Sequence, residues 1–121
     1  MNKKTRYIAT VIIAIAGLSL VSIPVVAIEF EHIKIEPYDE AKDSCYADDE
    51  DRLMGCISSN IPVAVLIYDD YDLIYCNEDC SHQIDKQLKS GRVEVIATNN
   101  QPDTANVSYY LKADIHTLHL S

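Results

Sequence analysis

Two cysteines separated by three residues, Cys76 and Cys80, are the side chains best placed to do chemistry. We expect them to flank the junction between a strand and a helix capped by Asn77. The dipole at a helix N-terminus stabilises a thiolate, so this position would activate one thiol as a nucleophile. Glu78 and Asp79 lie between the thiols, and their negative charges oppose that activation. The leading interpretation of the pair is a structural disulfide, and a redox-active pair is the alternative.

The order of the predicted elements resembles that of the thioredoxin-like thiol–disulfide oxidoreductases. The first three elements are a strand at His32–Ile35, a helix at Asp48–Ser58 and a strand at Pro62–Tyr68. The cysteine pair and its helix follow from Cys76 onward, and a further strand lies at Arg92–Thr98. The resemblance implies a thiol–disulfide oxidoreductase that uses Cys76 and Cys80. The spacing of three residues departs from the family's two, and His116 stands where the family has a cis-proline.

The same stretch supplies a set of metal-ligating side chains within seven residues: Cys76, Glu78, Cys80 and His82. Thiolate and imidazole together suit copper or zinc. The Cys-x-Glu-x-Cys core is similar to the loop of the dinuclear copper domains of respiratory oxidases, which implies a copper site. The histidine follows after one residue where that family has three, and no methionine follows it. A copper or zinc site is the second alternative, and the leading interpretation includes no cofactor.

All four cysteines follow the apolar N-terminal segment: Cys45, Cys56, Cys76 and Cys80. An even number of cysteines in a small exported domain predicts two structural disulfides. Three pairings are possible, and the sequence does not choose among them. Two such cross-links, at roughly 2–4 kcal/mol each, would supply much of the stability of so small a domain.

The N-terminal segment determines the predicted compartment. Lys3, Lys4 and Arg6 precede Tyr7–Ile28, a run of twenty-two residues without a charge. At about 1.5 Å per residue a helix of this length crosses a hydrocarbon core of roughly 30 Å. Residues 1–28 are therefore predicted to be a transmembrane helix with a cytoplasmic N-terminus, which makes this a single-pass protein of the cell membrane. The alternative is a signal peptide cleaved after Ala27, which would make the protein secreted.

Either reading exports residues 29–121 as one acidic domain. All nineteen acidic residues and seven of the ten basic ones follow Ala27, so this part carries a net charge of −12. Such a surface repels phosphate backbones, and we exclude nucleic acid as a partner. Asn106 begins an Asn-Val-Ser sequon and is a candidate for N-glycosylation in an exported protein.

Hydrophobic periodicity predicts an α+β domain of about four or five strands. Two short helices, one at Asp48–Ser58 and one beginning at Asn77, are expected to pack on one face of the sheet. Each predicted helix has apolar residues at a spacing of four, which places them on one face of a helix. They are Leu53 and Ile57 in the first helix and Ile84 and Leu88 in the second. The predicted strands are Phe30–Ile35, Ile61–Tyr68, Tyr71–Tyr75, Arg92–Thr98 and Val107–Ile115.

No serine–histidine–acid order, phosphate-binding loop or metalloprotease helix occurs in the sequence. We therefore predict a protein that is not an enzyme. It is expected to be a membrane-tethered, disulfide-stabilised extracytoplasmic domain that acts by protein contact, as a small accessory subunit of an integral membrane complex.

Overall fold

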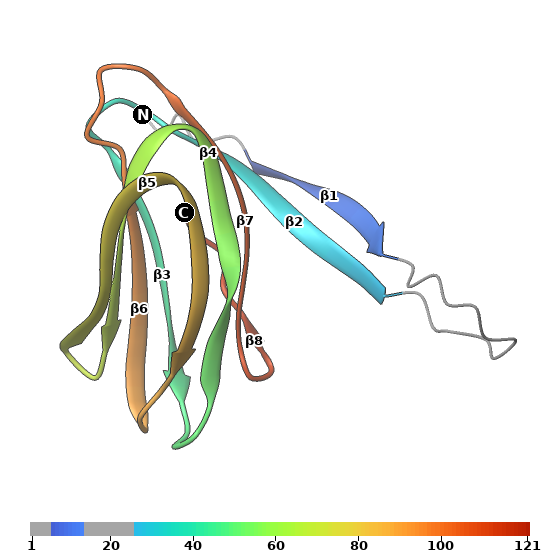
Figure 1. Ribbon diagram of the computed structural model, residues 1–121, viewed down its shortest axis with the longest axis vertical. Helices are drawn as coiled ribbons and strands as arrows, with labels where there is room; N and C mark the ends of the chain where they lie inside the picture. Colours follow the sequence, from blue (N-terminus) through green and yellow to red (C-terminus); the bar gives the residue numbers. More distant parts are fainter. Residues whose placement is uncertain (1–5, 14–25) are drawn as a thin grey trace, which may run out of the picture.

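The computed structural model describes residues 6–13 and 26–121, which form eight strands and no helix (Figure 1). The strands are β1 (Arg6–Ile13), β2 (Val26–Ile35), β3 (Glu40–Ala47), β4 (Arg52–Asp69), β5 (Asp72–Gln87), β6 (Gly91–Thr98), β7 (Ala105–Ala113) and β8 (His116–Thr117). All pairs are antiparallel, in the order β1-β2-β7-β4-β6-β3, with β5 also on β4 and β8 also on β7.

The long β4–β5 hairpin folds this sheet over on itself. The first part of β4, Leu53–Ser59, pairs with β7, and its last part, Ala64–Asp69, pairs with β6. β5 follows β4 through both parts, with a shift of register between Ser58 and Val63. Figure 1 shows both strands arching at this point. We call the two parts of the curled sheet the β7 half (β2, β7 and the adjoining parts of β4 and β5) and the β6 half (β3, β6 and the adjoining parts of β4 and β5).

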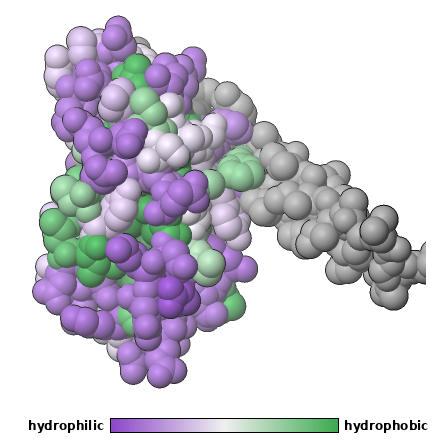
Figure 2. Space-filling model, viewed as in Figure 1, coloured by the Kyte–Doolittle hydropathy of each residue, from purple (hydrophilic) through white to green (hydrophobic). Residues whose placement is uncertain are grey.

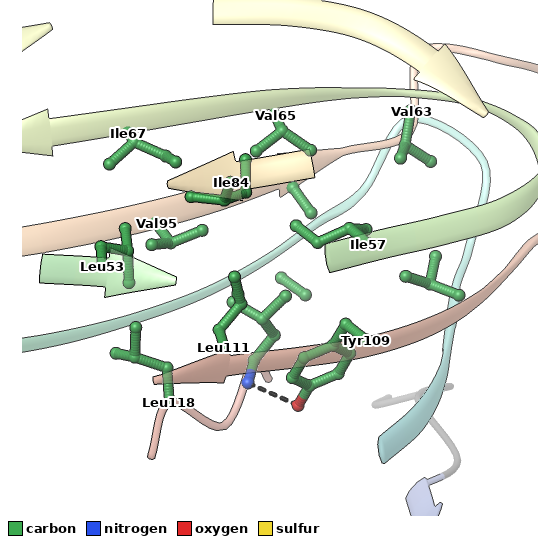
Figure 3. Packing of buried hydrophobic residues seen from close by; sticks show 14 of the residues in the cluster. Leu53, Ile57, Val63, Val65, Ile67, Ile84, Val95, Tyr109, Leu111 and Leu118 are labelled. Atoms are coloured by element: carbon green, nitrogen blue, oxygen red, sulfur yellow. Dashed lines mark hydrogen bonds between the residues drawn. The ribbon is translucent and has the colours of Figure 1, made fainter. Parts of the chain in front are cut away.

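The hydrophobic core lies between the two halves (Figure 3). Alternate residues of each strand point into it, as the period of a β-strand requires. The fully buried side chains of the core include Leu53, Ile57, Val63, Val65, Ile67, Val93, Val95, Tyr109, Leu111 and Leu120. Each half of the sheet therefore buries its inner face against the inner face of the other half.

The end of the chain closes the open side of the curl. The amide of Leu118 donates to the carbonyl of Leu111 in β7, and Ser121 exchanges two backbone hydrogen bonds with Lys42 in β3. Leu118 and Leu120 are buried, and the amide of Leu120 donates to the hydroxyl of Tyr109 at 2.8 Å. This tail therefore links β7 of one half to β3 of the other.

The predicted α+β class is wrong, because both predicted helices are strand in the structure. The segment Asp48–Ser58 makes a turn, in which the amide of Asp51 donates to the carbonyl of Asp48, and then enters β4 at Arg52. The segment from Asn77 onward lies within β5. A spacing of four places residues on one face in a strand as well as in a helix, so the pattern of Leu53 and Ile57 fits both.

The predicted transmembrane helix over Tyr7–Ile28 is also wrong where the structure describes it. Arg6–Ile13 is strand β1, and Val26–Ile28 begins β2. The rest of that prediction, at residues 14–25, lies outside the described residues. In the described part of the chain no helix has the length and apolarity needed to span a membrane. The alternative, cleavage after Ala27, stays a prediction, and its site falls near the start of β2.

Candidate functional site

The structure does not bring the predicted metal ligands together. They are Cys76, Glu78, Cys80 and His82 of β5. Cys76 lies opposite Leu66 on the outer side of the sheet, whereas His82 lies opposite the buried Ile57 on the inner side. The bend between them reverses the alternation of the strand. Within residues 29–121, no three or more His, Cys, Asp or Glu side chains are grouped so that they could hold a metal ion.

His82 instead stabilises the bend of the β4–β5 hairpin through hydrogen bonds. It is 1% exposed, and its Nε2 lies 3.0 Å from the carbonyl oxygens of both Val63 and Asp79. Because carbonyls only accept, Nε2 carries the hydrogen and donates to them. In the neutral ring, Nδ1 then accepts from the Tyr75 hydroxyl at 2.8 Å. Both ring nitrogens are occupied by the protein, which leaves His82 a structural role.

The predicted redox pair lies on a strand rather than at the start of a helix. From Cys76 to Asp79 the β4–β5 ladder is regular. Cys80 follows at the shift of register, and both cysteines are free thiols, Cys76 exposed and Cys80 partly buried. The helix required by the thioredoxin-like resemblance has no counterpart among the described residues.

All four cysteines are thiols in the structure, on different faces of the sheet. Cys45 faces inward from β3, next to the core. Burial raises the pKa of its thiol, and the negative charges of Asp43 and Asp51 raise it further. Cys56 lies on β4, opposite Tyr110, and burial raises the pKa of its thiol too. A raised pKa keeps both sulfurs protonated and weakly nucleophilic at neutral pH.

The strongest candidate for a functional surface is the outer face of the β6 half. Its register is fixed by the pairing of β3, β6, β4 and β5. One row across these strands reads Lys42, Ile96, Leu66 and Cys76, and the next reads Ser44, Glu94, Tyr68 and Leu73. We call the uncharged side chains in the middle of these rows and of the row beyond, namely Ala64, Leu66, Tyr68, Ile96 and Thr98, the apolar face; Glu94 is the one charged side chain among them. All five are partly exposed.

Charged and aromatic side chains surround the apolar face. The Arg92 guanidinium lies 3.4 Å from the Ser44 hydroxyl and 3.3 Å from the Glu94 carboxylate. These two contacts keep the Arg92 side chain close to the surface of β6. Tyr46 is 75% exposed and Tyr71 is 83% exposed. A shallow hollow of about 220 Å³ opens at this end of the face, lined by Tyr68, Tyr71, Arg92 and Glu94. An apolar centre with a polar rim is the usual anatomy of a protein-binding surface.

The outer face of the β7 half is different in character. Its central row consists of small polar side chains, with Ser81, Ser58 and Ser108 in register. A hollow of about 470 Å³ at one end is lined mostly by charged groups, and its Arg52 is paired with Asp85 at 2.6 Å. In Figure 2 the visible surface is mostly hydrophilic, with a hydrophobic area at the lower left, on the side of the β4–β5 turn. Beside the serine row, Cys56 and Tyr110 are in register, and the Tyr110 ring lies 6.4 Å from that of Phe30, so this face is polar at its centre with an aromatic pair next to it.

The candidate glycosylation residue Asn106 is exposed on β7. The hydroxyl of Ser108, the third residue of its sequon, lies 2.7 Å from Nδ1 of His32. β7 is flanked by β2 and β4, which pair with both sides of the sequon. Modification would therefore have to precede the docking of β7, and it stays a prediction.

The apolar face was not predicted from the sequence, because a nearly unbroken apolar run such as Ile61–Tyr68 is typical of a strand buried on both sides. The structure buries only Val63, Val65 and Ile67 of this run completely. Their neighbours Leu66 and Tyr68 face outward and remain partly exposed. The sequence did contain a signal for this exposed face. The domain is small and has too few elements to cover both faces of an apolar strand. No protein-family model and no curated protein matches this chain.

Proposed function

We propose that residues 29–121 are a non-catalytic contact domain, exported by the N-terminal segment, which binds a protein partner through the apolar face. The observation that carries this proposal is the apolar face itself, a group of neighbouring, partly exposed side chains on the outside of the β6 half, with the exposed Tyr46 and Tyr71 at one end. The partner is an extracytoplasmic part of a membrane complex, to which this domain is a small accessory subunit.

The composition of the face supports a protein as the ligand. Covering Leu66, Tyr68 and Ile96 would remove apolar area from water, and a fully buried side chain of this size is worth roughly 1.5–3 kcal/mol. Tyrosine and arginine are enriched among the residues that dominate binding energies. One end of the apolar face carries residues of these types, namely Tyr46, Tyr71 and Arg92. The domain's net charge of −12 favours a partner surface that carries positive charge around an apolar centre.

Site-specific photo-cross-linking in the cells that make the protein tests the proposal. A photoreactive phenylalanine analogue replaces Tyr46 or Tyr71 in the full chain, and a matched variant carries it at Tyr38, which is 71% exposed in the β2–β3 turn. We expect one partner protein to be cross-linked from positions 46 and 71 and not from position 38. Leu66→Ser should abolish that product. Equal cross-linking from all three positions, or a product unaffected by Leu66→Ser, would contradict the proposal.

A further inference from the structure

We propose that the tail, residues 118–121, closes the curl in a proton-sensitive way: His119 tightens it across the seam between β2 and β3 when its ring takes up a proton. The tail thereby regulates how firmly the two halves are held together. This regulation goes beyond the proposed function and does not involve the apolar face.

The seam is the line along which no strand pairing closes the curled sheet. Among the described strands, β2 pairs with β1 and β7, and β3 pairs with β6, so β2 and β3 share no ladder. Next to the β2–β3 turn the buried Asn99 holds the two strands. Its Nδ2 donates to the carbonyl of Ile35 at 3.0 Å, and its backbone amide donates to the carbonyl of Asp39 at 2.9 Å. Because an amide side chain does not titrate, this end of the seam stays closed as pH changes.

His119 crosses the rest of the seam with one contact on each side. Its backbone amide donates to Asp43 Oδ2 in β3 at 2.7 Å, and its ring Nδ1 lies 2.6 Å from Glu31 Oε1 in β2. An ionised carboxylate only accepts hydrogen bonds, so Nδ1 carries the hydrogen and donates it. The ring therefore joins the tail to β2, while the backbone joins it to β3.

The other hydrogen bonds of the tail do not depend on a proton near neutral pH. The Leu120 amide donates to the Tyr109 hydroxyl of β7 at 2.8 Å, which Figure 3 draws as a dashed line. Ser121 exchanges its two backbone bonds with Lys42. Backbone groups do not titrate, and a tyrosine hydroxyl ordinarily ionises only at about pH 10. His119 is thus the residue of the tail whose charge changes near neutrality.

Among the described residues, the charges that face His119 are negative. Glu31, from β2, is 6% exposed, and Asp43 faces the tail from β3. Lys42 stands next to Asp43 but lies in the outer row of β3. Cys45, further along β3, is uncharged near neutral pH, because burial and nearby negative charges raise the pKa of its thiol. A protonated His119 ring thus meets two carboxylates in a partly buried site, where salt screens their attraction less.

His119 can gain a proton without losing a hydrogen bond. Its side chain is half exposed, and no described residue bonds its Nε2, so this nitrogen can take up the proton. Protonation makes the bond to Glu31 charge-assisted, and such bonds are roughly twice as strong as neutral ones. His82 differs, because both of its ring nitrogens are bonded and a second proton would break the bond from Tyr75. The closed tail therefore holds the proton more tightly than the open tail, and by linkage a fall in pH favours closure.

Hydrogen exchange in the full chain tests this inference, at about pH 5.5 and about pH 7.5. Both values lie where histidines change charge and above the ordinary range of carboxyl groups. Protection factors, which correct for the intrinsic pH dependence of exchange, are measured for the amides of Leu118, Leu120 and Ser121. Each of these amides donates a hydrogen bond that docks the tail.

Three variants assign the effect to the ring. His119→Gln keeps a side-chain donor but cannot become charged, and Glu31→Gln removes the charge of its partner. His116→Gln, at an exposed histidine of β8, is the matched control. All three are measured at both pH values beside the wild-type chain.

In the wild type we expect the tail amides to be about fivefold or more better protected at the lower pH, with smaller changes in β4 and β7. The difference should disappear in His119→Gln and Glu31→Gln and persist in His116→Gln. Equal protection at both pH values in the wild type would overturn the inference, whether or not the variants fold. A difference that persists in His119→Gln, or that is as large in β4 and β7, would overturn it too. The cross-linking that tests the proposed function uses the outer face of the sheet, so the two proposals fail separately.

Discussion

The ring of His82 and the hydroxyl of Tyr75 meet at 2.8 Å across the bend of the β4–β5 hairpin. The rings also stack edge to face, with centroids 5.8 Å apart. Together they hold the point at which one pair of strands passes from the β7 half to the β6 half.

Replacing His82 with alanine should destabilise the domain by about 2–4 kcal/mol, because two carbonyls lose their donor and a buried cavity remains. Tyr75→Phe removes one hydrogen bond and should cost about 1 kcal/mol. Urea unfolding followed by circular dichroism measures both values. His116→Ala, at an exposed position of β8, is the control and should be nearly neutral. A His82→Ala variant as stable as this control would show that the bend does not need the ring.

The tail that closes the curl should contribute strongly to stability. Leu120 is completely buried, so Leu120→Ala should cost roughly 2–5 kcal/mol through lost burial and an unfilled cavity. Ile115→Ala is the matched control, because Ile115 is 79% exposed in the β7–β8 turn and should change stability little. Thermal unfolding of the two variants checks this. Equal melting temperatures would mean that the tail does not seal the core.

Two neighbouring residues of β4 should separate function from stability. Leu66 faces outward and Ile67 is completely buried. Ile67→Ala should cost about 2–5 kcal/mol, while Leu66→Ser should change stability by less than about 1 kcal/mol. Only Leu66→Ser should remove the cross-linked partner from a domain that remains folded. If Leu66→Ser destabilises the domain as much as Ile67→Ala, the apolar face is part of the core rather than a binding surface.

The thiols should differ in their reaction with iodoacetamide when no reductant is present. Exposed Cys76 should react first, while Cys45 and Cys56 should react slowly and accelerate only above the ordinary thiol pKa of 9.0. Mass spectrometry of tryptic peptides gives the order. If all four sulfurs resist alkylation until reductant is added, they form the two disulfides that the cysteine count predicts.

The raised thiol pKa values also predict how the stability of the folded domain changes with pH. In the unfolded chain the thiols of Cys45 and Cys56 release their protons near the ordinary value of 9.0, whereas in the folded domain they do so at higher pH. Through that interval the unfolded state binds fewer protons, so stability falls as pH rises. Cys45→Ala should reduce this slope in urea unfolding measured from pH 8 to about 10. A slope that is unchanged in Cys45→Ala would contradict the assignment.

Strands were predictable from the sequence where the side chains alternate without ambiguity. Ile61–Tyr68, Arg92–Thr98 and Val107–Ile115 overlap β4, β6 and β7 as expected. Between β4 and β5 the chain makes a tight hairpin turn at Asp70 and Tyr71, both at positive φ, and Asp69 pairs with Asp72.

The helices were mispredicted because a spacing of four cannot distinguish the two periods. Ile84 and Leu88, like Leu53 and Ile57, lie on one face in either structure. Long-range pairing decided the outcome, since both segments of the hairpin pair with each other and the first also pairs with β7. No window of local sequence contains that information.

The candidate site was less predictable than the fold. The stretch from Cys76 to His82 looked like one cluster because its members alternate, and the sequence does not reveal that the strand bends within it. The apolar face arises from the register of four strands, which brings Leu66 and Ile96 side by side from positions thirty residues apart. Register is a tertiary property, set by which strand finds which partner.

The hairpin shared by both halves has a consequence for biogenesis. β4 reaches the ribosome exit before β6 and β7, so its last part waits for β6 and its first part waits for β7 before each has a complete set of neighbours. The curl therefore closes only when almost the whole length of the polypeptide is available.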